Sequence, residues 1–108
     1  LMMDFLERFF FGDPIYGGVS RSPRWPSVRK SHLALHPTCE VCGTRKDREV
    51  HHCVPYHIRP EMELDYQNLI TLCRQDHLLF GHLNNFSSYN KTVREDARVW
   101  KLKITSRP

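Results

Sequence analysis

The sequence lacks a hydrophobic run long enough to cross a membrane. Its apolar opening, residues 1–11, is shorter than the roughly 20 residues that a membrane-spanning helix needs, and it carries Asp4, Glu7 and Arg8. We see no secretory leader, so we expect an intracellular protein with reduced thiols and no membrane partner. The sequence also lacks an internal repeat and a low-complexity tract, which argues against a repeat array.

The chain also has little length from which to build a core. Its 108 residues fit one domain, and a core from so short a chain is marginal enough that a structural metal would help it considerably. Sixteen Lys and Arg against twelve Asp and Glu give a formal net charge of +4. This mild excess favours polyanionic partners such as nucleic acids.

The ends of the chain differ in composition from its middle. The segment before residue 27 is rich in proline and glycine, which is typical of an extended linker. Residues 27–36 then have helical spacing, and Pro37 would end that helix. We therefore predict an N-terminal extension and linker at 1–26, a folded domain at 27–102 and a loose basic tail at 103–108.

Sequence patterns predict both strands and helices in the domain, which makes it α+β. Residues 48–54 and 69–72 are typical of short strands, and the loop between them has no regular periodicity. A helix is expected at about 76–82. Thr92 and Glu95 form the capping-box pattern of a further, amphipathic helix.

Two adjacent histidines, His51 and His52, lie near the end of the first predicted strand, and Asn68 and His77 follow further along the chain. Hydrolysing a phosphodiester needs a nucleophilic water, an ion that stabilises negative charge, and help for the departing oxygen. We predict that His51 and His77 bind the ion, that His52 is the general base, and that Asn68 holds the loop. Side chains of neighbouring strand residues point to opposite faces, so the strand must bend or end at this histidine pair.

His82 is a weaker candidate for the same metal site. It lies five residues after His77, about 140° around an α-helix that turns by about 100° per residue. We expect one catalytic divalent ion at the site, Mg²⁺, Mn²⁺ or similar. Arg29, Lys30 and His57 are candidate DNA contacts, although a solvated helix face explains the first two almost as well.

The cysteines predict a second, structural metal site. Cys39 and Cys42 have the CxxC spacing of a zinc knuckle, and Cys73 supplies a third thiolate where zinc prefers four tetrahedral ligands. Asp76 is either the fourth ligand or the N-cap of the helix that follows. We interpret Cys53 as a small buried apolar residue, with the missing zinc thiolate as its alternative role.

Together these motifs resemble the HNH endonuclease family: CxxCG at 39–43, EVHHCVP at 49–55, NLITLC at 68–73, and Asp76 next to His77. The resemblance implies a small ββα-metal (His-Me finger) core with a zinc knuckle and flanking helices, which nicks or cleaves DNA with one divalent ion. It is greatest with the compact phage and bacterial members. The resemblance therefore implies a location in the cytoplasm of a bacterium or of a phage-infected host. Asp76 departs from the family, which commonly has cysteine at this place.

The favoured hypothesis is therefore a metal-dependent HNH-type DNA endonuclease. The alternative is a catalytically inactive, zinc-stapled module that binds DNA or assists phage packaging, with packaging proteins as partners. A purely structural zinc domain for protein interactions is a third possibility. Nothing in the sequence marks a dimer face or a DNA sequence preference.

Overall fold

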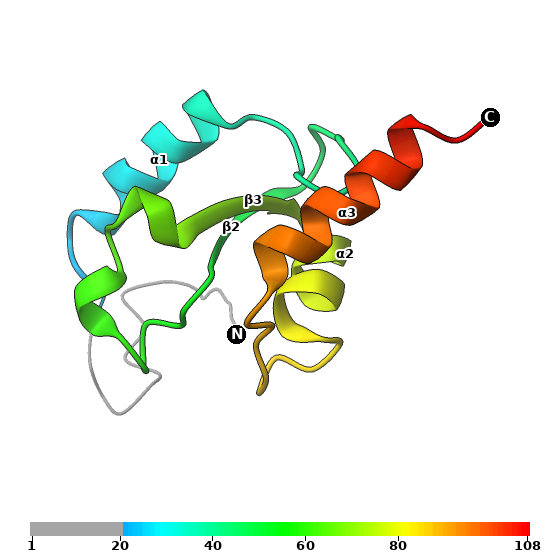
Figure 1. Ribbon diagram of the computed structural model, residues 1–108. Helices are drawn as coiled ribbons and strands as arrows, with labels where there is room; N and C mark the ends of the chain where they lie inside the picture. The colour runs from blue at the N-terminus through cyan, green and yellow to red at the C-terminus, as the bar shows by residue number, and fades with distance from the viewer. Residues whose placement is uncertain (1–20) are drawn as a thin grey trace.

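The computed structural model describes residues 21–108, so the first twenty residues of the predicted extension lie outside the described part (Figure 1). A two-stranded antiparallel sheet lies between α1 on one side and α2 with the π-helix η3 on the other. The elements in chain order are α1 (Trp25–Leu35), β2 (Arg48–His52), η1 (Pro60–Met62), η2 (Tyr66–Asn68), β3 (Leu69–Cys73), α2 (Arg74–Asp76), η3 (His77–Gly81) and α3 (Val93–Thr105). This is a small α+β ββα-metal finger, as the sequence predicts.

The sheet carries the residues from which the site is built. β2 and β3 pair from Arg48 opposite Cys73 to His52 opposite Leu69. Every residue of β3 is buried, because helices cover both faces of the sheet, which is why this strand is continuously apolar apart from one threonine. In β2 only the last three residues are buried, so the histidine pair lies at the enclosed end of the strand.

The hydrophobic core is small and contains part of the cysteine cluster. Its buried members come from the knuckle, β3 and α3: Cys39, Val41, Ile70, Leu72, Cys73, Val93 and Ala97. Two of these seven are cysteines of the CxxC and β3 motifs. Apolar burial contributes about 1.5–3 kcal/mol for each large aliphatic side chain, so a core of this size leaves much of the stability to other interactions.

Two helices extend past the domain boundaries expected from the sequence. α1 begins at Trp25, with Pro26 in its first turn, and the backbone N–H of Ser22 donates to the Glu63 carboxylate, so the expected linker boundary at residue 26 falls inside the packed unit. α3 continues to Thr105, so the predicted loose tail is helical over its first three residues. Local composition missed both, because packing and helix propagation extend elements past their sequence signals.

α3 also starts differently from the expected capping box. The Thr92 side chain makes no cap hydrogen bond to the helix backbone; its hydroxyl lies 3.1 Å from a carboxylate oxygen of Asp96. Buried Asn90 instead accepts from the Thr92 N–H at 3.0 Å and donates to Asp96 at 2.8 Å. Among residues 21–108, no helix combines the length and apolar content needed to span a membrane.

Candidate functional site

Three histidines converge between β2 and η3. One nitrogen from each of His51, His77 and His82 lies within 4.8 Å of the other two. Nε2 of His77 is 3.2 Å from Nε2 of His82. Nε2 of His51 is buried without a hydrogen-bond partner among the described residues, which is unusual for a polar atom. The three rings therefore surround one point to which all can offer a lone pair.

A π-helix explains why His82 belongs to this cluster. In an α-helix, residues five apart lie far apart around the axis, but η3 has π geometry, in which residue i+5 closes the turn begun by residue i. The expected 140° separation of His77 and His82 is therefore wrong. Gly81 makes the close approach possible, because a Cβ there would lie 2.9 Å from Nδ1 of His51 and 3.1 Å from Cδ2 of His77.

Outer hydrogen bonds orient two of the three rings. Nδ1 of His77 is 2.7 Å from the Glu49 carboxylate, and Nδ1 of His82 is 2.7 Å from the backbone carbonyl of Ser88. Both partners are acceptors, so both rings donate from Nδ1 and turn a bare Nε2 inward, as metal-binding histidines commonly do. Burial lowers the pKa of His82 to about 4, and burial together with its histidine neighbours lowers the pKa of His51. The neutral, metal-binding form is thus favoured.

The donor atoms fit a transition metal ion. Metal–nitrogen bonds of about 2.0–2.1 Å in a tetrahedron place neighbouring nitrogens roughly 3.3–3.4 Å apart, close to the 3.2 Å between His77 and His82. All three protein donors are imidazole nitrogens, which suit transition metals, whereas Mg²⁺ prefers oxygen ligands. Three protein ligands would leave positions on such an ion for water and a phosphate oxygen.

His52 lies on the other side of β2, outside the three-histidine cluster. Its ring packs 4.5 Å from the Trp25 ring of α1, whereas the His51 ring contacts those of η3. β2 ends at His52, so both histidines lie where the chain leaves the sheet. Nε2 of His52 is 2.9 Å from the backbone carbonyl of Glu63; it must donate, which leaves the lone pair of the neutral ring on Nδ1. Burial, then the charge of Arg21, lowers the pKa of His52 to about 3.

Asn68 joins the two ends of the loop between the strands. Its side chain is buried, and its Oδ1 accepts from the Val54 N–H at 2.8 Å. Its amide nitrogen donates to the carbonyls of Val54 and Met62, at 3.1 and 3.2 Å. Since Met62 precedes Glu63, these bonds place the carbonyl that holds His52.

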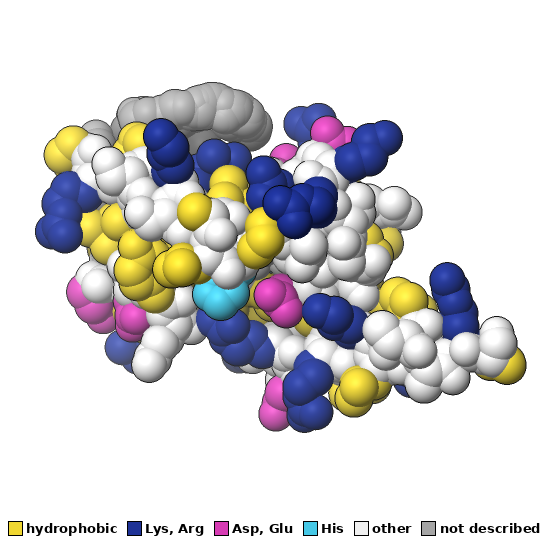
Figure 2. Space-filling view, turned by 90° about the horizontal axis from the view of Figure 1, so that it is seen from above, with side chains coloured by type: hydrophobic (Ala, Val, Ile, Leu, Met, Phe, Trp, Pro, Cys, Tyr) yellow, Lys and Arg dark blue, Asp and Glu magenta, His cyan; other side chains and the backbone are white. Residues whose placement is uncertain are grey.

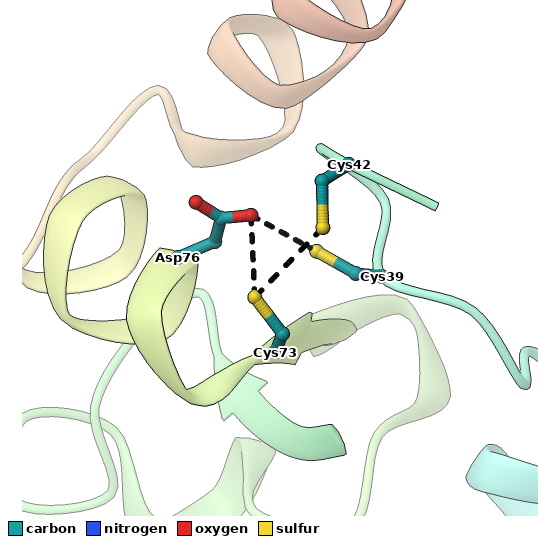
Figure 3. Close-up of side chains that lie close together, drawn as sticks. All are labelled: Cys39, Cys42, Cys73 and Asp76. Carbon is teal, nitrogen blue, oxygen red and sulfur yellow. Dashed lines mark hydrogen bonds between the residues drawn. The ribbon is translucent and has the colours of Figure 1, made fainter. Parts of the chain in front are cut away.

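The cysteine cluster lies at the other end of the sheet, where β3 ends and α2 begins (Figure 3). Cys39, Cys42, Cys73 and Asp76 each have one ligand atom within 4.8 Å of the others. The Cys42 and Cys73 sulfurs are 3.9 Å apart, and Oδ2 of Asp76 lies 3.3 Å from the sulfurs of Cys39 and Cys73. Tetrahedral zinc, with bonds of about 2.3 Å to sulfur and 2.0 Å to oxygen, would give roughly 3.8 and 3.5 Å. The cluster fits a structural zinc ion.

The alternatives for Asp76 and Cys53 are now separated. Asp76 precedes η3, but its side chain makes no cap hydrogen bond, and its Oδ2 instead accepts from the thiols of Cys39 and Cys73. Cys53 lies outside the cluster and packs against the hydrophobic core. Burial, together with the nearby Asp76 and Cys39, raises the pKa of the Cys73 thiol to about 12. A bound cation would reverse that shift, because zinc deprotonates the thiols that bind it.

Residues 39–82, which contain both clusters, match the sequence model of the HNH endonuclease family. This segment belongs to the HNH endonuclease family. No curated protein and no solved structure gives a significant match to the chain. Members of the family are usually nucleases, which implies a nucleic-acid substrate.

Some residues that shape the HNH site escaped the sequence analysis. Glu49 orients His77, and it has a usable signal, because it lies two residues before His51 and therefore on the same face of β2. Glu63 acts through its backbone carbonyl and Ser88 likewise, so neither side chain carries a signal. Gly81 is a small residue in a helix, whose role depends on the ring packed against it.

The predicted DNA contacts lie outside both clusters. Arg29 and Lys30 are exposed on α1, where they line a groove with residues of the knuckle. His57 is exposed in the loop that follows β2. The structure therefore brings together the metal-binding candidates and places His52 at the same strand end but on the opposite side of β2. It leaves Arg29, Lys30 and His57 on the surface.

Proposed function

We propose that this HNH protein is a metal-dependent endonuclease that hydrolyses phosphodiester bonds of DNA. The observation that carries the proposal is the three-histidine cluster, in which outer hydrogen bonds leave the Nε2 atoms of His77 and His82 3.2 Å apart beside the ring of His51. Nε2 of His51 is itself buried without a partner among the described residues. A site built only for packing would pair these lone-pair nitrogens with hydrogen-bond donors of the protein. Family membership supports the same conclusion.

His51, His77 and His82 would hold the catalytic ion. When bound, a divalent transition metal ion supplies a positive charge that stabilises the phosphate as negative charge develops on it. Glu49 and the Ser88 carbonyl keep two of the imidazoles in the required tautomer. Among the expected ions, Mg²⁺, Mn²⁺ or similar, we propose a transition metal and not Mg²⁺, because the donors are all nitrogen.

His52 is the proposed general base. Its Nε2–H is engaged by the Glu63 carbonyl, so Nδ1 accepts the proton of the attacking water. As the ring gains positive charge, its hydrogen bond to the carbonyl becomes charge-assisted and stronger. Asn68 is a positioning residue, since its three hydrogen bonds fix the loop that presents this carbonyl.

The zinc knuckle has a separate, structural role in this proposal. Cys39, Cys42, Cys73 and Asp76 would complete a closed set of four ligands, which leaves no position for substrate. Because α2 begins directly after Cys73 and continues into η3, the zinc ion would hold the start of the helix that carries His77 and His82.

Supercoiled plasmid tests the activity directly. We expect conversion to the open-circular form when Mn²⁺, Ni²⁺ or Zn²⁺ is added, with weaker or no conversion in Mg²⁺, because imidazole ligands bind transition metals more tightly. Dialysis against a weak chelator that leaves the structural zinc in place should stop nicking, and returning the ion should restore it. DNA binding without nicking in every ion would contradict the proposal and favour the inactive, DNA-binding alternative.

Gly81→Ala tests whether the three histidines share one ion. Alanine stabilises a helix by about 1 kcal/mol relative to glycine, so propensity alone predicts a neutral or favourable change. Its Cβ, however, would meet the His51 ring at 2.9 Å and push it out of the cluster. We expect the affinity for the catalytic ion to fall by about tenfold or more, as for other changes that disturb ligand orientation.

Isothermal titration with Ni²⁺ on zinc-loaded protein measures this affinity. Leu79→Ala is the matched control, because Leu79 lies in the same π-helix but is 42 % exposed. The control should bind as the wild type does. Unchanged Ni²⁺ affinity in Gly81→Ala would show that His51 is not a ligand.

A further inference from the structure

A basic groove runs between α1 and the segment that leads from the knuckle into β2. It has a volume of about 560 Å³ and is lined by Pro26, Arg29, Lys30, Leu33, Ala34, Pro37, Arg45 and Arg48. We call this set the basic groove. Figure 2 looks down on the molecule from the side of α1, and Lys and Arg side chains predominate over Asp and Glu on this face.

The charge of the basic groove is one-sided. Four of its eight lining residues are Lys or Arg, and none is Asp or Glu. Within residues 21–108, no ion pair involves Arg29, Lys30 or Arg45, and all three are exposed. Basic residues on a protein surface commonly alternate with acidic ones, so four cations around one hollow favour a polyanionic ligand over a solvated helix face.

One of these cations is held in place. Nη1 of Arg48 donates to the backbone carbonyl of Pro37 at 3.0 Å, across the base of the groove. This bond fixes Arg48 between the knuckle and the start of β2 and leaves its other guanidinium donors available. A fixed guanidinium suits the geometry of a phosphate oxygen pair.

The basic groove and the three-histidine cluster both include residues of β2. Arg48 directly precedes Glu49, whose carboxylate binds His77. Arg74 also lies 3.6 Å from Glu49. Positively charged side chains thus lie in the basic groove and also beside Glu49, at the edge of the metal site.

We propose that the basic groove binds the sugar–phosphate backbone of the same DNA duplex that is cut at the histidines. The bound phosphates would lie a short distance along the DNA from the cleaved phosphate. This inference rests on the proposed function, because it names where the substrate of that site extends. Contacts of this kind position the duplex but read no bases, so they give register without sequence preference. They also make binding strongly salt-dependent, because each neutralised phosphate releases counterions.

The test is the salt dependence of duplex binding by the triple variant Arg29→Ala, Lys30→Ala, Arg45→Ala. Fluorescence anisotropy with a labelled duplex, without added catalytic ion, gives the affinity at several KCl concentrations. The slope of log K against log salt should become less negative by about 2–3, since each lost phosphate contact removes about 0.9. The affinity near 0.15 M salt should fall by roughly tenfold or more.

The matched control is Lys91→Ala, Arg98→Ala, Lys103→Ala, which removes the same charge from exposed residues outside the groove. It should change the slope by less than half as much. Equal slopes in the wild type and the groove variant, or equal loss in the control, would overturn the proposal, as would a wild-type protein that does not bind the duplex. Zinc content and thermal melting should match the wild type, because all replaced side chains are exposed.

Hydrolysis of bis(p-nitrophenyl) phosphate separates this inference from the proposed function. The small diester has no chain that reaches the basic groove, so the groove variant should hydrolyse it at the wild-type rate. If the groove variant has the less negative slope but the wild type never cleaves the diester, the groove proposal stands and the nuclease proposal fails. If the wild type cleaves the diester but the groove variant has the wild-type slope, the nuclease proposal stands and the groove proposal fails.

Discussion

His52→Ala is expected to slow metal-dependent plasmid nicking by about 10²- to 10⁴-fold, the usual contribution of a general base. The ring that is lost has one nitrogen engaged by the Glu63 carbonyl and the other carrying the lone pair, so alanine removes a proton acceptor and leaves the metal ligands in place. We therefore expect Ni²⁺ affinity to stay within a few-fold of the wild type. Nicking rates under single-turnover conditions, alongside Ni²⁺ titration, measure both quantities.

His52 is buried against Trp25, so its removal also leaves a cavity that could lower stability. Two measurements keep the base assignment testable. His52→Asn fills much of the cavity without a basic nitrogen and should be equally slow. Added imidazole should partly restore nicking in His52→Ala but not in His77→Ala. His36→Ala, an exposed histidine at the end of α1, is the control and should nick normally. Wild-type nicking by His52→Ala would end this assignment.

The side chains that share a face could be predicted, because alternation along a strand is a property of the backbone. It correctly places His51 and His52 against different elements, η3 and α1. The same rule, applied backward from His51, identifies Glu49 as a neighbour of the site. The strand's end at His52 also follows, since two adjacent histidines can serve one substrate only where the chain leaves the sheet.

The position of His82 could not be predicted in the same way. The sequence His-Leu-Leu-Phe-Gly is compatible with ordinary α-helix, and nothing local requires η3 to open into π geometry. What stabilises the wider turn is tertiary: the Ser88 carbonyl accepts from His82, and the N–H of Asn90 bonds to the Gly81 carbonyl. Similarly, the Glu63 carbonyl that orients His52 would be present with any side chain at that position.

The start of α1 shows a third kind of limit. Proline and glycine before residue 27 indicate a linker by composition, yet Ser22 and Trp25 pack against the loop and against His52. Proline is compatible with the first turn of a helix, so Pro26 marks a helix start as well as it marks a linker. Only the contacts made across the sheet distinguish the two interpretations.

The largest effect on stability is expected from Cys39→Ala. Cys39 is fully buried and belongs to both the zinc cluster and the hydrophobic core. Its replacement by alanine would leave three of the four zinc ligands in the cluster. Structural zinc contributes apparent binding free energies of about 10–16 kcal/mol in finger peptides, comparable to the total stability of about 5–15 kcal/mol of an ordinary domain. We therefore expect the variant to lose zinc and its cooperative thermal transition. Atomic emission and near-ultraviolet circular dichroism measure the two.

Cys53→Ala is the matched control, since this cysteine packs against the same core but lies outside the zinc cluster, and it should keep one zinc ion and a cooperative transition. Asp76→Cys should keep the zinc and raise the melting temperature, because a fourth thiolate suits zinc better than a carboxylate does. Asp76→Asn should bind zinc more weakly than the wild type. If Cys39→Ala melts cooperatively at the wild-type temperature, the cluster is a hydrogen-bonded group of thiols around Asp76, and the helix that carries His77 and His82 is held by core packing alone.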